Sequence, residues 1–99
     1  MKIGTLIKTV RTARGIPQKE FSGRLNVSTN YLSLLENGRR NPSQDLVKKV
    51  ASVLEISVDA LEFLSTEIPK ELDSENSLKY QSLQENIATL LIFKSQKVA

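Results

Sequence analysis

The chain has 99 residues, of which 39% are hydrophobic and 25% are charged, a composition that suits one globular domain with an appendage. It contains no Cys and no His, so it lacks a disulfide framework, a thiolate nucleophile and the most common general base and metal ligand. No apolar stretch is long enough to span a membrane, and the N-terminus lacks the apolar block of a signal peptide. We therefore expect a cytoplasmic protein that is not an enzyme and has no cofactor or metal site.

The net charge of +3 is unevenly distributed along the chain. Residues 1–64 hold ten Lys and Arg against six Asp and Glu, whereas residues 65–99 hold four against five. A basic N-terminal part favours an anionic partner such as nucleic acid, although many soluble domains reach a charge of this size by chance.

Residues 2–14 are predicted to form the first helix, because apolar residues recur there at the spacing of one helical face and Gly15 follows as a stop. These apolar residues are Ile3, Leu6, Ile7 and Val10. Pro17 suits the first turn of a short second helix, which contains Phe21 and Leu25. Asn26 can end this helix because asparagine tolerates the left-handed conformation that a helix end often requires.

Ser28, Ser43 and Ser57 predict the starts of three further helices, because a serine hydroxyl can accept a hydrogen bond from the first turn. The third helix is expected to end at Asn37-Gly38, where Gly supplies a positive φ. The predicted buried residues are Leu32 and Leu35 in the third helix and Leu46, Val47, Val50, Ala51 and Leu54 in the fourth. The apolar residues Val58, Leu61 and Leu64 predict the short fifth helix. Five short helices therefore fill residues 1–64.

Residues 65–77 have too little apolar content to pack and are predicted to form a linker. Residues 78–99 are predicted to form a C-terminal helix with a seam of apolar side chains at the spacing of a helix that packs on another helix. The seam residues are Tyr80, Leu83, Ile87 and Leu90. The seam is either a dimer contact or the face by which this helix folds back on its own domain.

Residues 18–43, QKEFSGRLNVSTNYLSLLENGRRNPS, closely resemble the Cro/repressor (XRE-type) helix-turn-helix family of phage and bacterial regulators. The match continues through residues 46–61, LVKKVASVLEISVDAL. The resemblance implies an all-α, lambda-repressor-like domain of five helices, followed by the linker and the C-terminal helix. Two residues depart from the family pattern, Ser22 in place of Ala and Asn26 in place of Gly. Both fit the expected geometry, because Ser is small enough for the two helices to approach each other and Asn tolerates positive φ in the turn.

In this family the second helix crosses the DNA backbone and the third enters the major groove. The base-facing positions that the resemblance implies are Thr29, Asn30, Ser33 and Leu34. Asn30 is the strongest candidate for reading a base, because its amide can form two hydrogen bonds with adenine. Contacts with the DNA backbone are implied for Gln18, Lys19, Tyr31, Arg39, Arg40, Asn41 and Ser43. Gln18 is also expected to buttress the third helix, and the Tyr31 ring has the alternative of covering that helix's side.

The resemblance also pairs Arg11 in the first helix with Glu36 at the end of the third as an internal ion pair. It implies a bacterial or phage-encoded transcriptional regulator, most often a repressor, that binds near-palindromic double-stranded DNA as a homodimer. The seam from Tyr80 to Leu90 would supply the dimer contact. The alternative function is that of an interaction protein, such as an antitoxin or adaptor, whose C-terminal helix binds a separate protein partner.

Overall fold

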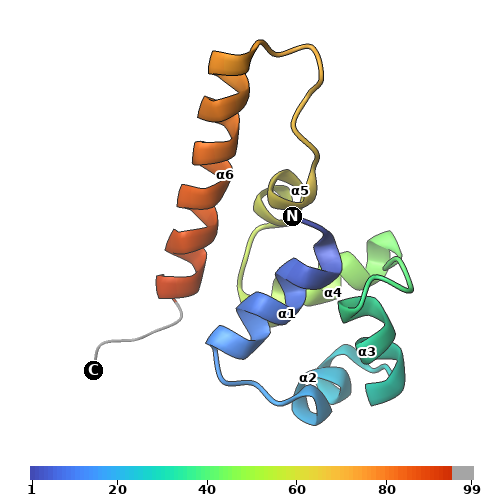
Figure 1. Cartoon of the computed structure of the whole chain (residues 1–99). Coiled ribbons are helices and arrows are strands. Elements are labelled where there is room, and N and C mark those ends of the chain that lie inside the picture. The colour runs from blue at the N-terminus through green and yellow to red at the C-terminus, as the bar shows by residue number, and fades with distance from the viewer. Residues whose placement is uncertain (95–99) are drawn as a thin grey trace.

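The computed structural model describes residues 1–94, so the last five positions of the predicted C-terminal helix, 95–99, lie outside the described residues. The described residues form six helices and no strands. These are α1 (Ile3–Ala13), α2 (Gln18–Leu25), α3 (Thr29–Glu36), α4 (Gln44–Leu54), α5 (Val58–Ser65) and α6 (Ser74–Lys94). Helices α1 to α5 form a bundle, and α6 lies beside α1 and α5, on the side away from α2 and α3 (Figure 1). The predicted all-α class and order of helices are confirmed.

Serine side chains cap three of the helices, as predicted. The hydroxyl oxygens of Ser28, Ser43 and Ser57 accept hydrogen bonds from the backbone N–H groups of Tyr31, Leu46 and Ala60 at 3.0, 3.2 and 3.0 Å. Each cap satisfies one of the N–H groups that a helix leaves unpaired at its start, which stabilises the helix by about 1 kcal/mol. The caps therefore define where α3, α4 and α5 begin.

Gly15 and Gly38 follow α1 and α3 with positive φ, and two further helices end at a non-glycine residue in the left-handed conformation. Asn26 follows α2 with φ 59°, as predicted, and Glu55 follows α4 with φ 55°. Glu55 was not predicted, because glutamate is not a residue type that favours this conformation. The guanidinium of Arg14 donates a hydrogen bond to the carbonyl oxygen of Leu54, which satisfies this end of α4. Burial lowers the pKa of Arg14 from its usual value, and the Glu55 carboxylate partly offsets that effect.

The core consists of apolar side chains from all five helices of the bundle. It contains Leu6, Ile7, Val10, Phe21, Leu25, Leu32, Leu35, Leu46, Val47, Val50, Ala51, Leu54, Ile56, Leu61 and Leu64. Burying one Leu or Phe side chain contributes about 1.5 to 3 kcal/mol. Because Leu32 and Leu35 anchor one side of α3 in this core, the opposite side of α3 lies at the surface.

Helix α1 approaches α3 very closely at Gly4. A Cβ atom added to Gly4 would overlap the backbone carbonyl group of Leu35, so only glycine permits this approach. The sequence patterns did not single out Gly4, because a lone glycine near the start of a helix carries no such signal. The contact sets the distance between α1 and the C-terminal turn of α3.

Helix α6 begins at Ser74, inside the segment 65–77 that was expected to be a linker. The connection from α5 to α6 therefore covers only residues 66–73. The carboxylate of Asp73 accepts a hydrogen bond from the backbone N–H of Asn76 at 2.8 Å. Polar residues are favoured at the start of a helix as well as in a connection. The polar residues from Ser74 onward therefore form the exposed first turn of α6.

One side of α6 packs against the bundle. The ring centroids of Tyr80 and Phe63 are 5.3 Å apart, and the Gln84 amide donates hydrogen bonds to the backbone carbonyls of Phe63 and Thr66 at 2.8 and 2.9 Å. Ile87 is half-buried against the core. With this side, α6 folds back on its own domain, which was one of the two alternatives for the C-terminal helix. Neither α6 nor any other helix within residues 1–94 is long and apolar enough to cross a membrane.

The predicted seam is divided between two sides of α6. Tyr80 and Ile87 face the bundle, whereas Leu83 and Leu90 are 51% and 68% exposed. The 3-4-3 spacing of the four residues is that of a helix that coils around a partner helix and touches it along one line. In the structure the buried line instead runs through Gln84, which the apolar pattern could not identify.

Replacing Gly4 with Ala should lower the free energy of unfolding by about 1 to 3 kcal/mol, because the added methyl group forces α1 away from α3. Gly23→Ala is the matched control, since nothing lies within 4 Å of the added Cβ at that position in α2. Alanine there should raise stability by about 0.5 to 1 kcal/mol through helix propensity. Urea denaturation measures both changes. Unchanged stability of the Gly4 variant would contradict the close-approach argument.

Candidate nucleic-acid interface

The first turn of α3 lies at the surface of the bundle. Thr29 and Asn30 are exposed, whereas Leu32 and Leu35 on the opposite side are 0% and 1% exposed. Ser28 caps this end of the helix. The buried face holds α3 in place and leaves its N-terminal turn accessible to a DNA major groove, which is about 12 Å wide.

Other residues that the resemblance assigned to base or backbone contacts are less accessible. Ser33 and Leu34 are half-buried. Tyr31 is also half-buried, and it packs against the hydrophobic core cluster, in agreement with the interpretation that its ring covers the side of the third helix. Of the four base-facing candidates, Thr29 and Asn30 are therefore the most accessible.

The remaining candidate backbone contacts lie before and after α3 in the chain. Lys19 is exposed in the first turn of α2, and Arg39 and Arg40 are exposed in the loop between α3 and α4. Asn41 and Ser43 are exposed at the start of α4, where the helix dipole places partial positive charge. These groups are of the types that bind phosphates.

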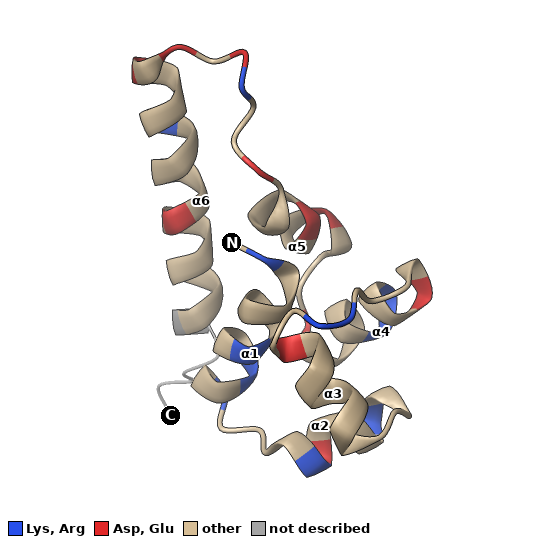
Figure 2. Cartoon of the chain, turned by 45° about the vertical axis from the view of Figure 1, so that its right-hand side comes forward, with Lys and Arg blue, Asp and Glu red and all other residues tan. Residues whose placement is uncertain are grey.

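Charge is separated between the two ends of the molecule. Residues 1–54 hold ten Lys and Arg against three Asp and Glu, whereas residues 55–94 hold three against eight. Figure 2 shows acidic residues on α5, on the loop after it and on α6, which also carries lysine, whereas most lysine and arginine lie on α1 to α4 and in the α3–α4 loop. The charges of residues 1–64 and 65–99 differ less, because residues 1–64 include the acidic residues of α5 together with the basic helices. The exposed turn of α3 belongs to the basic end, which attracts a polyanion.

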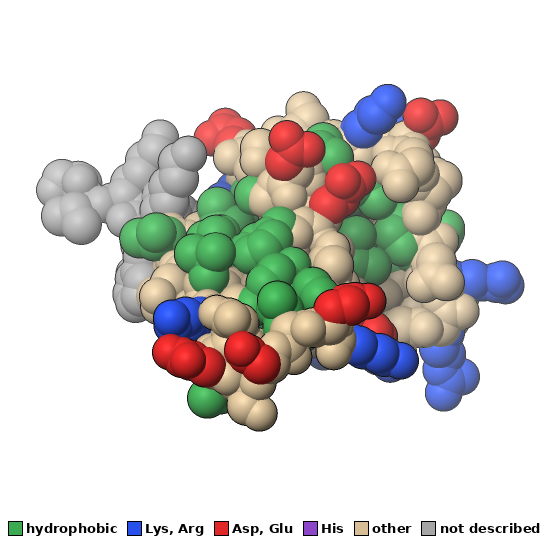
Figure 3. Space-filling view, turned by 90° about the horizontal axis from the view of Figure 1, so that it is seen from above, with side chains coloured by type: hydrophobic (Ala, Val, Ile, Leu, Met, Phe, Trp, Pro, Cys, Tyr) green, Lys and Arg blue, Asp and Glu red, His purple; other side chains and the backbone are tan. Residues whose placement is uncertain are grey.

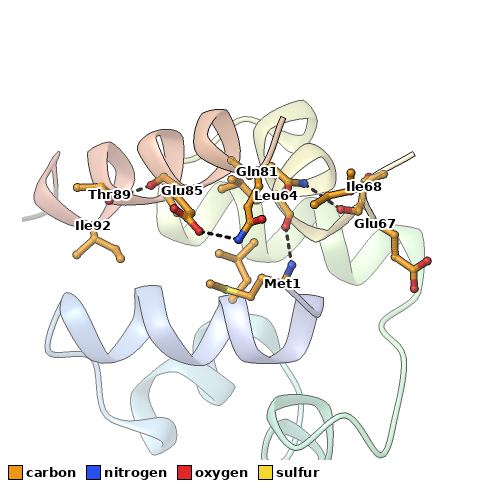
Figure 4. A pocket seen from close by; sticks show the side chains of 12 residues that line it. Met1, Leu64, Glu67, Ile68, Gln81, Glu85, Thr89 and Ile92 are labelled. Carbon is orange, nitrogen blue, oxygen red and sulfur yellow. Dashed lines mark hydrogen bonds between the residues drawn. The ribbon is translucent and has the colours of Figure 1, made fainter. Parts of the chain in front are cut away.

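Apolar surface gathers at the other end, away from α3. Seen from above, hydrophobic side chains cluster on the face that contains α6 (Figure 3). A groove of about 560 Å³ separates α6 from α1 and α5. Met1, Leu6, Leu64, Ile68, Ala88 and Ile92 supply its apolar lining. The N-terminal ammonium group of Met1 donates to the backbone carbonyl of Leu64 at 3.4 Å within this groove (Figure 4).

Arg11 and Glu36 form the ion pair between α1 and α3 that the resemblance implies. Nε of Arg11 donates to Oε2 of Glu36 at 2.7 Å, and Nη2 donates to Oε1 at 3.0 Å. Nη1 of Arg11 donates to the backbone carbonyl of Ile16 at 2.8 Å. Both charged residues are buried, at 8% and 5% exposure. The bidentate geometry compensates both charges and joins the end of α3 to α1.

Gln18 connects this ion pair to the middle of α3. Its Nε2 donates to Oε1 of Glu36 at 2.9 Å, and its Oε1 accepts a hydrogen bond from the Ser33 hydroxyl at 3.4 Å. A carboxylate can only accept, so Glu36 determines which way the Gln18 amide points. The buttressing contact expected of Gln18 is therefore present in the structure.

A second polar contact joins α2 directly to the exposed turn. Ser22 is 3% exposed, and its hydroxyl donates to the backbone carbonyl of Lys19 at 3.1 Å. The same oxygen lies 3.2 Å from Oγ1 of Thr29, within hydrogen-bond distance. The sequence showed Ser22 as a departure from the family pattern, at a point where two helices approach. It did not predict the contact with Thr29.

Comparisons with known proteins agree with this architecture. A family model described as helix-turn-helix matches residues 7–61. An ImmF control region 10 kDa protein of Bacillus phage phi105 is 31% identical over 70 residues, which cover 71% of this chain and 78% of that protein. The immunity repressor protein of the same phage is 35% identical over 77 residues, covering 78% of this chain and 54% of the repressor. The HTH-type transcriptional regulator SinR of Bacillus subtilis is 40% identical over 76 residues, covering 74% and 68%. No solved structure gave a significant match.

Replacing Glu36 with Ala should lower the free energy of unfolding by about 3 to 5 kcal/mol, because the buried Arg11 guanidinium then loses its counter-charge. The matched control is Glu20→Ala in the first turn of α2, where the carboxylate is exposed. That change should cost less than about 1 kcal/mol, the usual contribution of a surface charge at a helix start. Thermal and urea denaturation compare the two variants, and equal losses would argue against the ion pair.

Proposed function

The chain belongs to the helix-turn-helix family of DNA-binding transcriptional regulators, and we propose that it binds specific double-stranded DNA sequences with the N-terminal turn of α3. One observation carries this proposal. Thr29 and Asn30 are exposed at the start of a helix whose other face is buried, at the basic end of the molecule. Repression is the proposed output, because one similar protein is named an immunity repressor.

Asn30 reads a base most directly in this proposal. Its amide can donate to N7 and accept from the N6 amino group of adenine, a bidentate pair that contributes about 1 to 3 kcal/mol of discrimination. Thr29 is the neighbouring contact in the same turn. Leu34, which is half-buried, contributes apolar contact with a thymine methyl group, and Ser33 supports the reading turn through Gln18.

Phosphate contacts hold α3 in register on the duplex. Arg39 and Arg40 are placed in the loop directly after α3, and Lys19 is placed in the first turn of α2. Asn41 and the first turn of α4 add neutral donors at a helix N-terminus, where backbone N–H groups favour an anion. These contacts supply affinity without reading sequence.

Two copies act together, and Leu83 and Leu90 of α6 join them. One α3 reads too few base pairs for strong binding at physiological salt, so a second copy on an adjacent half-site is required. Leu83 and Leu90 stand two helical turns apart on the same side of α6, and both are largely exposed. Helix α6 lies away from α3, so pairing through α6 leaves both reading turns free (Figure 1).

The operator is first selected from random duplexes with the wild-type chain. Asn30→Ala should then reduce discrimination against mismatched operators by about 1 to 3 kcal/mol and leave the salt dependence unchanged. Arg40→Ala should weaken binding to all sequences evenly and reduce the slope of log affinity against log salt by about 0.9. Lys79→Ala on the exposed surface of α6 is the control. Selection that yields no sequence, or an Asn30 variant with unchanged discrimination, contradicts the proposal.

The double variant Leu83→Glu, Leu90→Glu should be a folded monomer, because charged side chains cannot pack across an apolar contact. Its operator affinity should fall by about tenfold or more, since the second copy is no longer linked. Ser82→Glu adds a charge at a neighbouring exposed position and serves as the control. Sedimentation and circular dichroism report assembly and folding. A double variant that still dimerises tightly refutes the role of these two leucines.

A further inference from the structure

We propose that Thr29 acts only as a hydrogen-bond acceptor toward DNA, because its hydroxyl proton is donated to Ser22. It follows that the chain prefers an amino base, adenine or cytosine, over a keto base at the position that Thr29 contacts. This inference rests on the proposed function, since it specifies which chemistry the reading turn recognises.

The direction of the hydrogen bonds follows from a count of protons. Each hydroxyl group carries one proton and can accept through its oxygen. Ser22 donates its proton to the carbonyl of Lys19 at 3.1 Å. The contact of 3.2 Å between Ser22 and Thr29 is then a hydrogen bond only if Thr29 is the donor. With the opposite direction, Ser22 would have no proton left for Lys19. Only one arrangement makes both bonds.

Burial favours that arrangement. Ser22 is 3% exposed, so water cannot replace a bond that its hydroxyl fails to make. Thr29 is exposed, and in free protein water satisfies the remaining acceptor positions of its oxygen. When DNA displaces that water, a base that donates a proton keeps both internal bonds intact. A base that requires a proton from Thr29 breaks the bond to Ser22.

The major groove offers both kinds of base. Adenine N6 and cytosine N4 carry amino groups that donate, whereas guanine O6 and thymine O4 only accept. An acceptor at Thr29 therefore distinguishes A and C from G and T on the strand that it faces. It does not distinguish A from C, so the expected signature is a two-base preference and not a single base.

A separate set of hydrogen bonds makes the Ser33 hydroxyl donate its proton into the protein in the same way. Ser33 lies one turn after Thr29, and its hydroxyl donates inward to Oε1 of Gln18 at 3.4 Å. Gln18 is held in this orientation because its Nε2 faces the Glu36 carboxylate. Both hydroxyl groups on this side of α3 thus point their protons into the protein. The contact between Ser22 and Thr29 is shorter than that between Ser33 and Gln18, and Thr29 is more exposed than Ser33. The test therefore uses Thr29.

The experiment measures affinities for the selected operator and for all its single base-pair variants. The wild-type chain should show one position where amino bases bind about tenfold tighter than keto bases, the range that one hydrogen bond spans. Ser22→Ala frees the Thr29 proton, so keto operators should improve to within about twofold of amino operators, whose affinity is retained. Thr29→Val should instead lower the amino operators to the level of the keto ones. Ser52→Ala, at an exposed position on α4, is the matched control and should keep the wild-type preference.

The outcomes separate this inference from the function on which it rests. If the wild-type chain selects no sequence, the proposed function fails and the inference fails with it. If it selects an operator whose amino preference survives Ser22→Ala, only the inference is overturned. Effects of Ser22→Ala and Thr29→Val at different base pairs also overturn it. Should Ser22→Ala fold poorly in urea denaturation, Thr29→Val decides alone: a loss confined to amino operators supports the inference, and an even loss across all operators overturns it.

Discussion

The buried charge on Glu36 constrains the whole reading end of the molecule. A carboxylate taken out of water must be matched by an opposite charge and by hydrogen-bond donors, and here Arg11 and Gln18 supply both. Such a pair contributes little net stability, but any movement of α3 away from α1 would separate the charges at high cost. The close approach at Gly4 limits movement in the other direction. Together these two contacts fix α3 on α1.

The fixed position of α3 also determines how polar groups at its surface are oriented. The Gln18 amide can adopt only one orientation beside Glu36, and it in turn orients the Ser33 hydroxyl. On the neighbouring side, Ser22 does the same for Thr29. Helix α2 therefore does more than support the turn, because it decides which hydrogen-bonding groups α3 offers to a ligand. In the proposed function, residues that never touch DNA help to determine which bases are accepted.

Local rules were sufficient for most of the fold. The capping serines, the left-handed Asn26 and the apolar faces of five helices follow from residue type and spacing, so they could be predicted without knowledge of the tertiary structure. The ion pair between Arg11 and Glu36 was predicted from the family resemblance. What could not be predicted depends on partners distant in the chain, such as the glycine contact at Gly4. The start of α6 at Ser74 was missed because polar residues suit a connection and a first helical turn equally well.

The separation of charge has a consequence for the way the protein meets another molecule. A basic end and an acidic end make the chain an electric dipole whose positive pole carries the first turn of α3. In the field of a polyanion such a molecule rotates before it touches, so that encounters begin with α3 foremost and α6 turned outward. The acidic residues around α5 and in the loop after it thus favour encounters in which α3 faces the polyanion, although they lie at the far end of the molecule.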